Sequence, residues 1–106
     1  MVNVTFSDID CEVVKCQYAE NDQVALELVA IDSPGNREKG IDQGECVAMA
    51  TSCLPGFPFR DGQTVIKDYM ENSGMLAALV GCGAVEMTGE LAFSGHACYP
   101  VVDVRL

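Results

Sequence analysis

Positive charge is the scarcest property of this chain. Only six Lys and Arg residues stand against 16 Asp and Glu residues among 106, which gives a formal net charge of −10. Nucleic acids and anionic membranes carry charge of the same sign, and proteins that bind them directly normally neutralise phosphates with Lys and Arg. We therefore expect no direct binding to nucleic acid and none to a membrane surface. Any role in nucleic-acid biology would be indirect.

Long apolar runs are also absent. No uninterrupted apolar segment approaches the roughly 20 residues that span a bilayer. The opening residues, MVNVTFSD, contain no basic leader followed by an apolar stretch, and we expect a cytoplasmic protein. A chain of 106 residues has the length of one domain that can bury its own core, so we predict a single domain over residues 1–106.

Signatures of catalysis are missing as well. The chain has no P-loop, no dinucleotide-binding fingerprint and no nucleophile elbow, and its carboxylates are dispersed without a recognisable acid–base pair. His96 is the only histidine, and Cys98, two residues further on, is the one thiol with a base near it in the sequence. We expect no enzymatic activity, no catalytic residue and no cofactor.

Cysteine, by contrast, is plentiful, at positions 11, 16, 46, 53, 82 and 98. In a small secreted chain six cysteines would predict a disulfide framework, but without an export signal we expect reduced thiols that pack as small apolar residues. A structural metal is the alternative interpretation. The spacings C-x4-C, C-x6-C and His-x-Cys do not match the close C-x2-C pairs of ordinary zinc sites, so we expect no metal.

Hydrophobic residues make up 49% of the chain, and most of them alternate with polar residues as in strands. We predict strands over residues 2–6, 10–18, 24–31, 46–54, 64–69, 84–87, 91–93 and 99–106, with a hairpin turn at Ser7-Asp8. Apolar residues at helical spacing from Met75 to Val80 predict one helix, capped by Asn72 or Ser73 and ending at residues 81–83. The pattern indicates an α+β fold in which one helix covers a curved antiparallel sheet or small open barrel.

The strand predicted over residues 10–18 begins with an acidic face. Asp8, Asp10 and Glu12 alternate with apolar residues, so an extended chain directs three carboxylates to one side. Alternate residues repeat every ~6.5–7 Å, broadly comparable to the spacing of phosphates along a nucleic-acid strand. One interpretation of this acidic ladder is a surface for a basic partner. The other is the solvated outer face of a half-buried sheet.

Residues 33–45, SPGNREKGIDQGE, are rich in Gly and charge and predict a surface loop or long hairpin tip. Such a loop either takes part in recognition or is an insertion without a role. Tyr18, Phe57 and Phe59 are candidate anchors of an interface, with ordinary packing as the alternative. The predicted partner-binding carboxylates are Asp8, Asp10, Glu12, Glu20, Asp22, Glu38, Asp42 and Glu45.

Four segments carry a resemblance to a known family. The run from Ile66 reads IKDYMENSGMLAALVGCGAVEMTG, and the chain ends in PVVDVRL. With the earlier DCEVV and ALELV segments, they resemble a family of small uncharacterised proteins of gut Firmicutes, their phages and mobile elements. Residues 33–45 and the cysteine content depart from that family. The resemblance implies a small cytoplasmic protein that travels with mobile DNA, and it brings no function for individual residues.

A folded acidic domain holds its carboxylates in fixed positions and can present them to a basic partner. In the setting of a mobile element, this predicts an acidic protein-binding module that inhibits a bacterial defence nuclease by occupying its basic nucleic-acid channel, as an anti-CRISPR protein does. The alternative is a small regulatory or structural interaction protein of a mobile element without nucleic-acid mimicry. Such a protein would bind through an apolar patch or a sheet edge.

Overall fold

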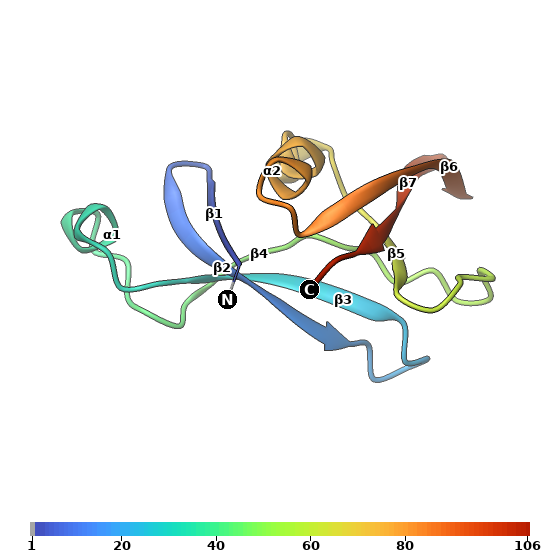
Figure 1. Cartoon of the computed structure of the whole chain (residues 1–106), viewed down its shortest axis with the longest axis horizontal. Coiled ribbons are helices and arrows are strands. Elements are labelled where there is room, and N and C mark those ends of the chain that lie inside the picture. The colour runs from blue at the N-terminus through green and yellow to red at the C-terminus, as the bar shows by residue number, and fades with distance from the viewer. Residues whose placement is uncertain (1) are drawn as a thin grey trace.

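Figure 1 shows a computed structural model of the chain, in which residues 2–106 are described. The molecule is elongated, with principal extents of 42 × 23 × 23 Å. Its elements within these residues are β1 (Asn3–Phe6), β2 (Ile9–Gln17), β3 (Val24–Ala30), α1 (Pro34–Glu38), β4 (Cys46–Met49), β5 (Gln63–Val65), the 3-10 turn η1 (Met70–Asn72), α2 (Met75–Gly81), β6 (Val85–Ser94) and β7 (Ala97–Val104).

The strands form two antiparallel sheets, with the orders β1-β2-β3-β4 and β5-β7-β6. The α+β prediction is confirmed, and α2 is the predicted covering helix. The strands divide between two open sheets, however, and no barrel closes. The strand predicted over residues 46–54 shows where the two sheets separate. It ends at Met49, and the chain then crosses from the larger sheet towards the smaller one. Pro55 and Pro58 lie on that crossing, where proline cannot continue a ladder of backbone hydrogen bonds.

The turn between β1 and β2 is the predicted Ser7-Asp8 hairpin. Both residues have positive φ angles, 52° and 62°, and Phe6 pairs with Ile9 across the turn. Two residues in this conformation form a type I′ turn, whose twist matches that of the strands it joins. Asp8 therefore belongs to the turn, and β2 begins one residue after it.

The main core is built from both sheets and α2. Leu26 and Leu28 of β3, Met75 and Leu79 of α2, and Val102 of β7 are all fully buried within it. Helix α2 contacts β1 of one sheet and β6 of the other, so it bridges the two sheets, as Figure 1 shows. Its apolar stripe is thus core, as the spacing predicts. None of the helices within residues 2–106 is both long and apolar enough to cross a membrane.

A second apolar cluster lies on the opposite face of the smaller sheet. Val101 belongs to it while its neighbour Val102 belongs to the main core, because successive residues of a strand point to opposite faces. Phe57 and Phe59 pack against this second cluster, and their ring centroids lie 4.6 Å apart. The two rings therefore pack over an apolar cluster. This is the ordinary packing that the sequence leaves open as the alternative to a role as interface anchors.

The cap of helix α2 differs from the sequence prediction. Neither Asn72 nor Ser73 caps the helix, whose N-cap position is Gly74 with no side-chain hydrogen bond. Asn72 is buried and donates its Nδ2 to the carbonyl oxygen of Met49, at 2.7 Å. The carboxylate of Asp68 accepts from the backbone N–H of Leu76 instead, at 3.1 Å. The predicted end of the helix is confirmed, since α2 stops at Gly81.

Three further predicted strands differ from the structure. The strands predicted over residues 84–87 and 91–93 are one strand, β6, whose pairing with β7 shifts register between Met87 and Leu91. Gly89 lies in this irregular stretch with a φ of +84°. The strand predicted over residues 64–69 is only the short β5, and the chain beyond it forms η1.

Candidate acidic interface

The predicted carboxylates divide between the two ends of β2. Asp8 lies in the turn before this strand, and Glu20 and Asp22 lie in the turn after it. Because β2 has nine residues, a rise of roughly 3.3 Å per residue separates the two turns by about 26 Å. The eight carboxylates therefore do not form one continuous surface.

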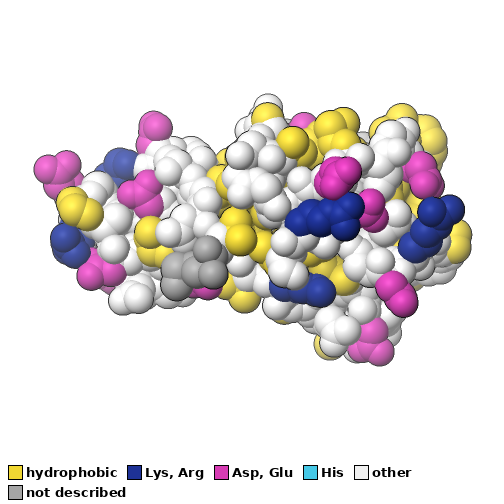
Figure 2. Space-filling model, viewed as in Figure 1, with side chains coloured by type: hydrophobic (Ala, Val, Ile, Leu, Met, Phe, Trp, Pro, Cys, Tyr) yellow, Lys and Arg dark blue, Asp and Glu magenta, His cyan; other side chains and the backbone are white. Residues whose placement is uncertain are grey.

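Six of the eight belong to what we call the α1 end, formed by residues 3–12 and 31–45. This end holds α1, the β1–β2 turn and the chain that leads into β4, and Figure 2 shows acidic side chains spread around it, with basic side chains among them. Backbone hydrogen bonds close it, including Ala30 N–H to Glu45 O (2.9 Å) and Gly44 N–H to Ala30 O (2.8 Å). The predicted carboxylates here are Asp8, Asp10, Glu12, Glu38, Asp42 and Glu45.

Residues 33–45 are more ordered than a loop prediction implies, because they begin with helix α1. Ser33 caps the helix, and its hydroxyl oxygen accepts from the backbone N–H of Asn36 at 3.1 Å. Pro34 follows at the start of the helix, where its missing N–H costs nothing. The remainder of the segment, after Glu38, returns over the surface towards β4.

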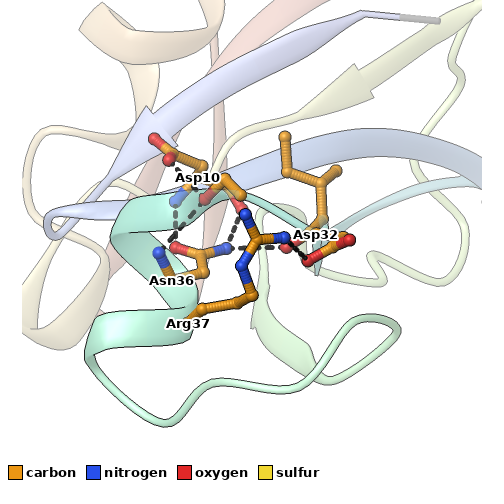
Figure 3. Close-up of polar contacts among 6 residues, drawn as sticks. Asp10, Asp32, Asn36 and Arg37 are labelled. Atoms are coloured by element: carbon orange, nitrogen blue, oxygen red, sulfur yellow. Dashed lines mark hydrogen bonds and ion pairs between the residues drawn. The ribbon is translucent and has the colours of Figure 1, made fainter.

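Buried Asn36 fastens this helix to β2, as Figure 3 shows. Its Oδ1 accepts from the backbone N–H of Asp10 at 3.0 Å, and its Nδ2 donates to the carbonyl oxygen of Asp10 at 2.8 Å. Nδ2 also donates to the carbonyl oxygen of Ile31 at 2.9 Å. The amide thus pairs with Asp10 as a neighbouring strand would, and it fixes the position of α1.

The acidic ladder is shorter than predicted, because only Asp10 and Glu12 lie on one face of β2. Asp8 lies in the turn, and the carboxylate of Asp10 is occupied by two hydroxyl donors, Thr5 Oγ1 at 3.0 Å and Ser33 Oγ at 2.8 Å. The hydrogen bonds from Ser33 and Thr5 lower the pKa of Asp10. Asp10 is therefore a structural residue that ties residues 33–45 to the sheet. Asp10 and Glu12 share one face of β2, and of these two carboxylates only that of Glu12 has no hydrogen-bond donor within residues 2–106.

The other predicted carboxylates of the α1 end form no ion pair within residues 2–106. Within residues 2–106, the ion pairs join Arg37 to Asp32, Lys67 to Glu71, and Arg105 to Glu86 and Asp103. None of these acids belongs to the predicted set. Lys39 contacts the backbone oxygen of Asp8. Glu38, Asp42 and Glu45 are exposed, so their charges face solvent.

Comparison of the chain with known protein families, with curated proteins and with solved structures found no match. The resemblance at residues 66–90 to small proteins of mobile elements therefore stays a prediction.

The apolar residues that the sequence singled out are not the exposed ones. Tyr18 is half-buried, and its hydroxyl lies 2.9 Å from Oγ1 of Thr51. The most exposed apolar side chains of the described residues are instead Met70 of η1 and three side chains of β6, where Met87, Leu91 and Phe93 are 56%, 55% and 72% exposed. Their partners alternate along β7, so all three lie on one face of an edge strand. Alternation predicted a strand here, but it could not show that this strand is an edge.

The six thiols within residues 2–106 differ in exposure, from buried Cys11 to exposed Cys16, Cys46 and Cys98. All six cysteines are free, and no hydrogen bond joins His96 to Cys98 within residues 2–106. Burial, with the charge of Asp10, raises the pKa of Cys11 to about 11, which suppresses its thiolate. No group of three or more His, Cys, Asp or Glu side chains that could hold a metal ion occurs among these residues.

Proposed function

We propose that this chain is an acidic protein-binding module that docks its α1 end against a basic surface of a partner protein. The observation that carries the proposal is the charge of this end. Residues 3–12 and 31–45 contain seven acidic and two basic residues, a formal charge of −5, which is half of the net −10 of the whole chain. Glu38, Asp42 and Glu45 are exposed there without an ion pair among the described residues.

The rigidity of the α1 end supports the same proposal. Charged loops that order only on binding lose affinity to the entropy of ordering. Here the three amide hydrogen bonds of buried Asn36 already hold α1 against β2. A basic partner then meets carboxylates in fixed positions. Complementary charge of this kind accelerates association and disfavours wrong partners more than it prolongs the complex.

The partner class that we put first is a nuclease of a bacterial defence system, whose nucleic-acid channel is lined with Arg and Lys. An acidic domain that occupies such a channel blocks the nucleic acid by charge and shape. This choice of partner follows from the resemblance to mobile-element proteins, and the charge of the α1 end is its physical support.

A second candidate function has its own observation. The exposed face of edge strand β6, with Met87, Leu91 and Phe93, suits a regulatory interaction that buries apolar side chains. Binding of this kind depends little on salt, because it does not rest on opposite charges. The salt dependence of binding therefore separates the two candidates.

The test compares two double charge reversals of equal size. Glu38→Lys with Asp42→Lys changes the α1 end, and Glu20→Lys with Asp22→Lys makes the same change at the β2–β3 turn. The partner is first captured from lysates of a CRISPR-bearing host and identified by mass spectrometry, then purified. Its dissociation constant is measured at about 0.1 and 0.5 M salt, where the screening lengths are about 10 and 4–5 Å.

We expect the reversal at the α1 end to weaken binding by at least about tenfold, mostly through a slower association rate, while the reversal at the turn has a smaller effect. Binding should also weaken as salt rises. Equal losses in the two variants would contradict docking through the α1 end. Salt-independent binding that Leu91→Ser with Phe93→Ser abolishes would establish the β6 face instead.

A further inference from the structure

A cleft of about 540 Å³ opens between the β2–β3 hairpin and residues 56–63. It lies along the continuation of the buried face of β2. Cys11 and Val13 of that face are buried in the main core, and the next residues of the same face are Lys15 and Gln17, which line the cleft. The strand therefore runs beyond the core and presents polar groups where its face would otherwise be apolar.

The lining of the cleft is formally neutral in a chain of net charge −10, because it holds two of the six basic residues. Of the six basic residues, Arg37, Lys67 and Arg105 form ion pairs, and Lys39 contacts a backbone oxygen. The two that remain, Lys15 and Arg60, have no ion pair within residues 2–106, and both line this cleft. The cleft's own carboxylates, Asp22 and Asp61, form no ion pair with either cation.

An apolar wall accompanies these cations. The rings of Phe57 and Phe59 line the cleft and are held by their packing against the second apolar cluster. Gln23 fixes the backbone just before them, because its Nε2 donates to the oxygen of Leu54 at 2.6 Å and its Oε1 accepts from the Leu54 N–H at 2.8 Å. Gln63 accepts from the N–H of Arg60 at 3.1 Å on the other side. These hydrogen bonds hold the segment that carries Phe57 and Phe59 at both of its ends. Leu54 is held by Gln23, next to β3, and Arg60 is held by Gln63 of β5.

We propose that this cleft binds a small organic oxyanion, a carboxylate or phosphate carried on a flat apolar ring. Lys15 and Arg60 hold the oxyanion, since a guanidinium and an ammonium both donate to such oxygens. The ring lies against Phe57 and Phe59. The volume lies within the roughly 300–1,000 Å³ of small-molecule sites. This site is separate from the α1 end, so it stands or fails independently of the protein-binding proposal.

The experiment is a titration of the ¹⁵N-labelled chain followed by amide chemical shifts. The probes are phenyl phosphate and benzoate, with inorganic phosphate and the neutral benzyl alcohol for comparison. The variants are Lys15→Gln and Arg60→Gln, with Arg37→Gln as the matched control outside the cleft. The amide spectrum of each variant reports at the same time whether it is folded.

We expect saturable shifts at residues 15–24 and 56–63 with one or both ring oxyanions at millimolar concentration. Loss of either cation should weaken binding about tenfold, the ratio expected for loss of a charged hydrogen bond. Arg37→Gln should bind as the natural chain does. Three results would overturn the proposal: no saturable shifts with either ring oxyanion, unchanged binding in folded Lys15→Gln and Arg60→Gln, or inorganic phosphate or benzyl alcohol binding as tightly as the ring oxyanions.

Discussion

Replacing Asn36 with alanine tests the contact that holds the α1 end together. The substitution removes three hydrogen bonds and leaves the N–H of Asp10 and the carbonyl oxygen of Ile31 without their side-chain partner. The carbonyl oxygen of Asp10 keeps one donor, the N–H of Ile31 at 3.1 Å. Two buried polar groups left unsatisfied would cost about 1–3 kcal/mol each. Because Asp10 and Ile31 are only half-buried, we expect Asn36→Ala to lower the free energy of unfolding by about 2–4 kcal/mol, the lower part of that range.

Asn36→Asp separates the effect of the lost hydrogen bonds from that of a cavity. It keeps the size of the side chain but replaces the donating Nδ2 with an oxygen, which then faces the carbonyl oxygens of Asp10 and Ile31. Repulsion joins the loss of the hydrogen bonds, and we expect this variant to be at least as unstable as Asn36→Ala. A cavity alone would make the alanine variant the worse of the two.

The assay is urea unfolding followed by circular dichroism, with Asn3→Ala as the control. Asn3 is exposed on β1, and a change at such a position usually alters stability by less than about 0.5 kcal/mol. Hydrogen exchange of the Asp10 amide should accelerate in both Asn36 variants, because that amide loses its acceptor. A loss in Asn36→Ala no larger than that in Asn3→Ala would refute the reasoning.

Three further predictions follow from single groups. The pKa of Asp10 lies below its ordinary value of 3.8, so its contribution to stability is present at neutral pH and is lost as the pH falls below that value. Asp10→Asn should therefore flatten this part of an acid-unfolding curve, and an unchanged curve would contradict the assignment. Iodoacetamide at pH 8 should label Cys11 only after urea unfolding, whereas equal labelling of all six thiols in the folded chain, seen by mass spectrometry, would contradict its burial. Met75→Ala should cost about 2–5 kcal/mol in the same urea assay and Met70→Ala almost nothing, because Met75 is fully buried and Met70 is 79% exposed; equal losses would overturn this assignment of the core.

Local pattern predicted much of the fold because the forces behind it are local. Alternation identified the strands, since one face of each sheet must be buried, and Ser7-Asp8 marked a hairpin because both residues adopt the positive φ of a tight turn. The division into two sheets could not be read in this way. It depends on long-range contacts such as the isolated pairing of Thr51 with Ile66, which no periodicity encodes.

The site was harder to predict because its key contacts join distant residues. Asn36 pairs with Asp10, 26 positions away in sequence, and an Asn in a Gly-rich segment ordinarily predicts only a turn. Asp10 looked like a surface charge for the same reason, since its hydroxyl partners come from β1 and from Ser33. For the cleft between the β2–β3 hairpin and residues 56–63, the sequence did contain one signal. The apolar alternation of Cys11 and Val13 continues into Lys15 on the same face, and this places a cation where burial is expected.

Screening decides under which conditions the two acidic surfaces can be tested separately. The β1–β2 turn of the α1 end and the β2–β3 turn are about 26 Å apart along the nine residues of β2, whereas the Debye length is about 10 Å at 0.1 M salt and about 30 Å at 0.01 M. At 0.1 M or above, reversing Glu20 and Asp22 leaves the potential at the α1 end almost unchanged, so this variant is a valid control. At 0.01 M both reversals alter the field at both ends, and both should then slow association with a basic partner. The two variants should therefore differ in association rate at 0.1 M salt and agree at 0.01 M. That result would show that the partner docks at one end of the chain, while the charge of the whole chain steers its approach.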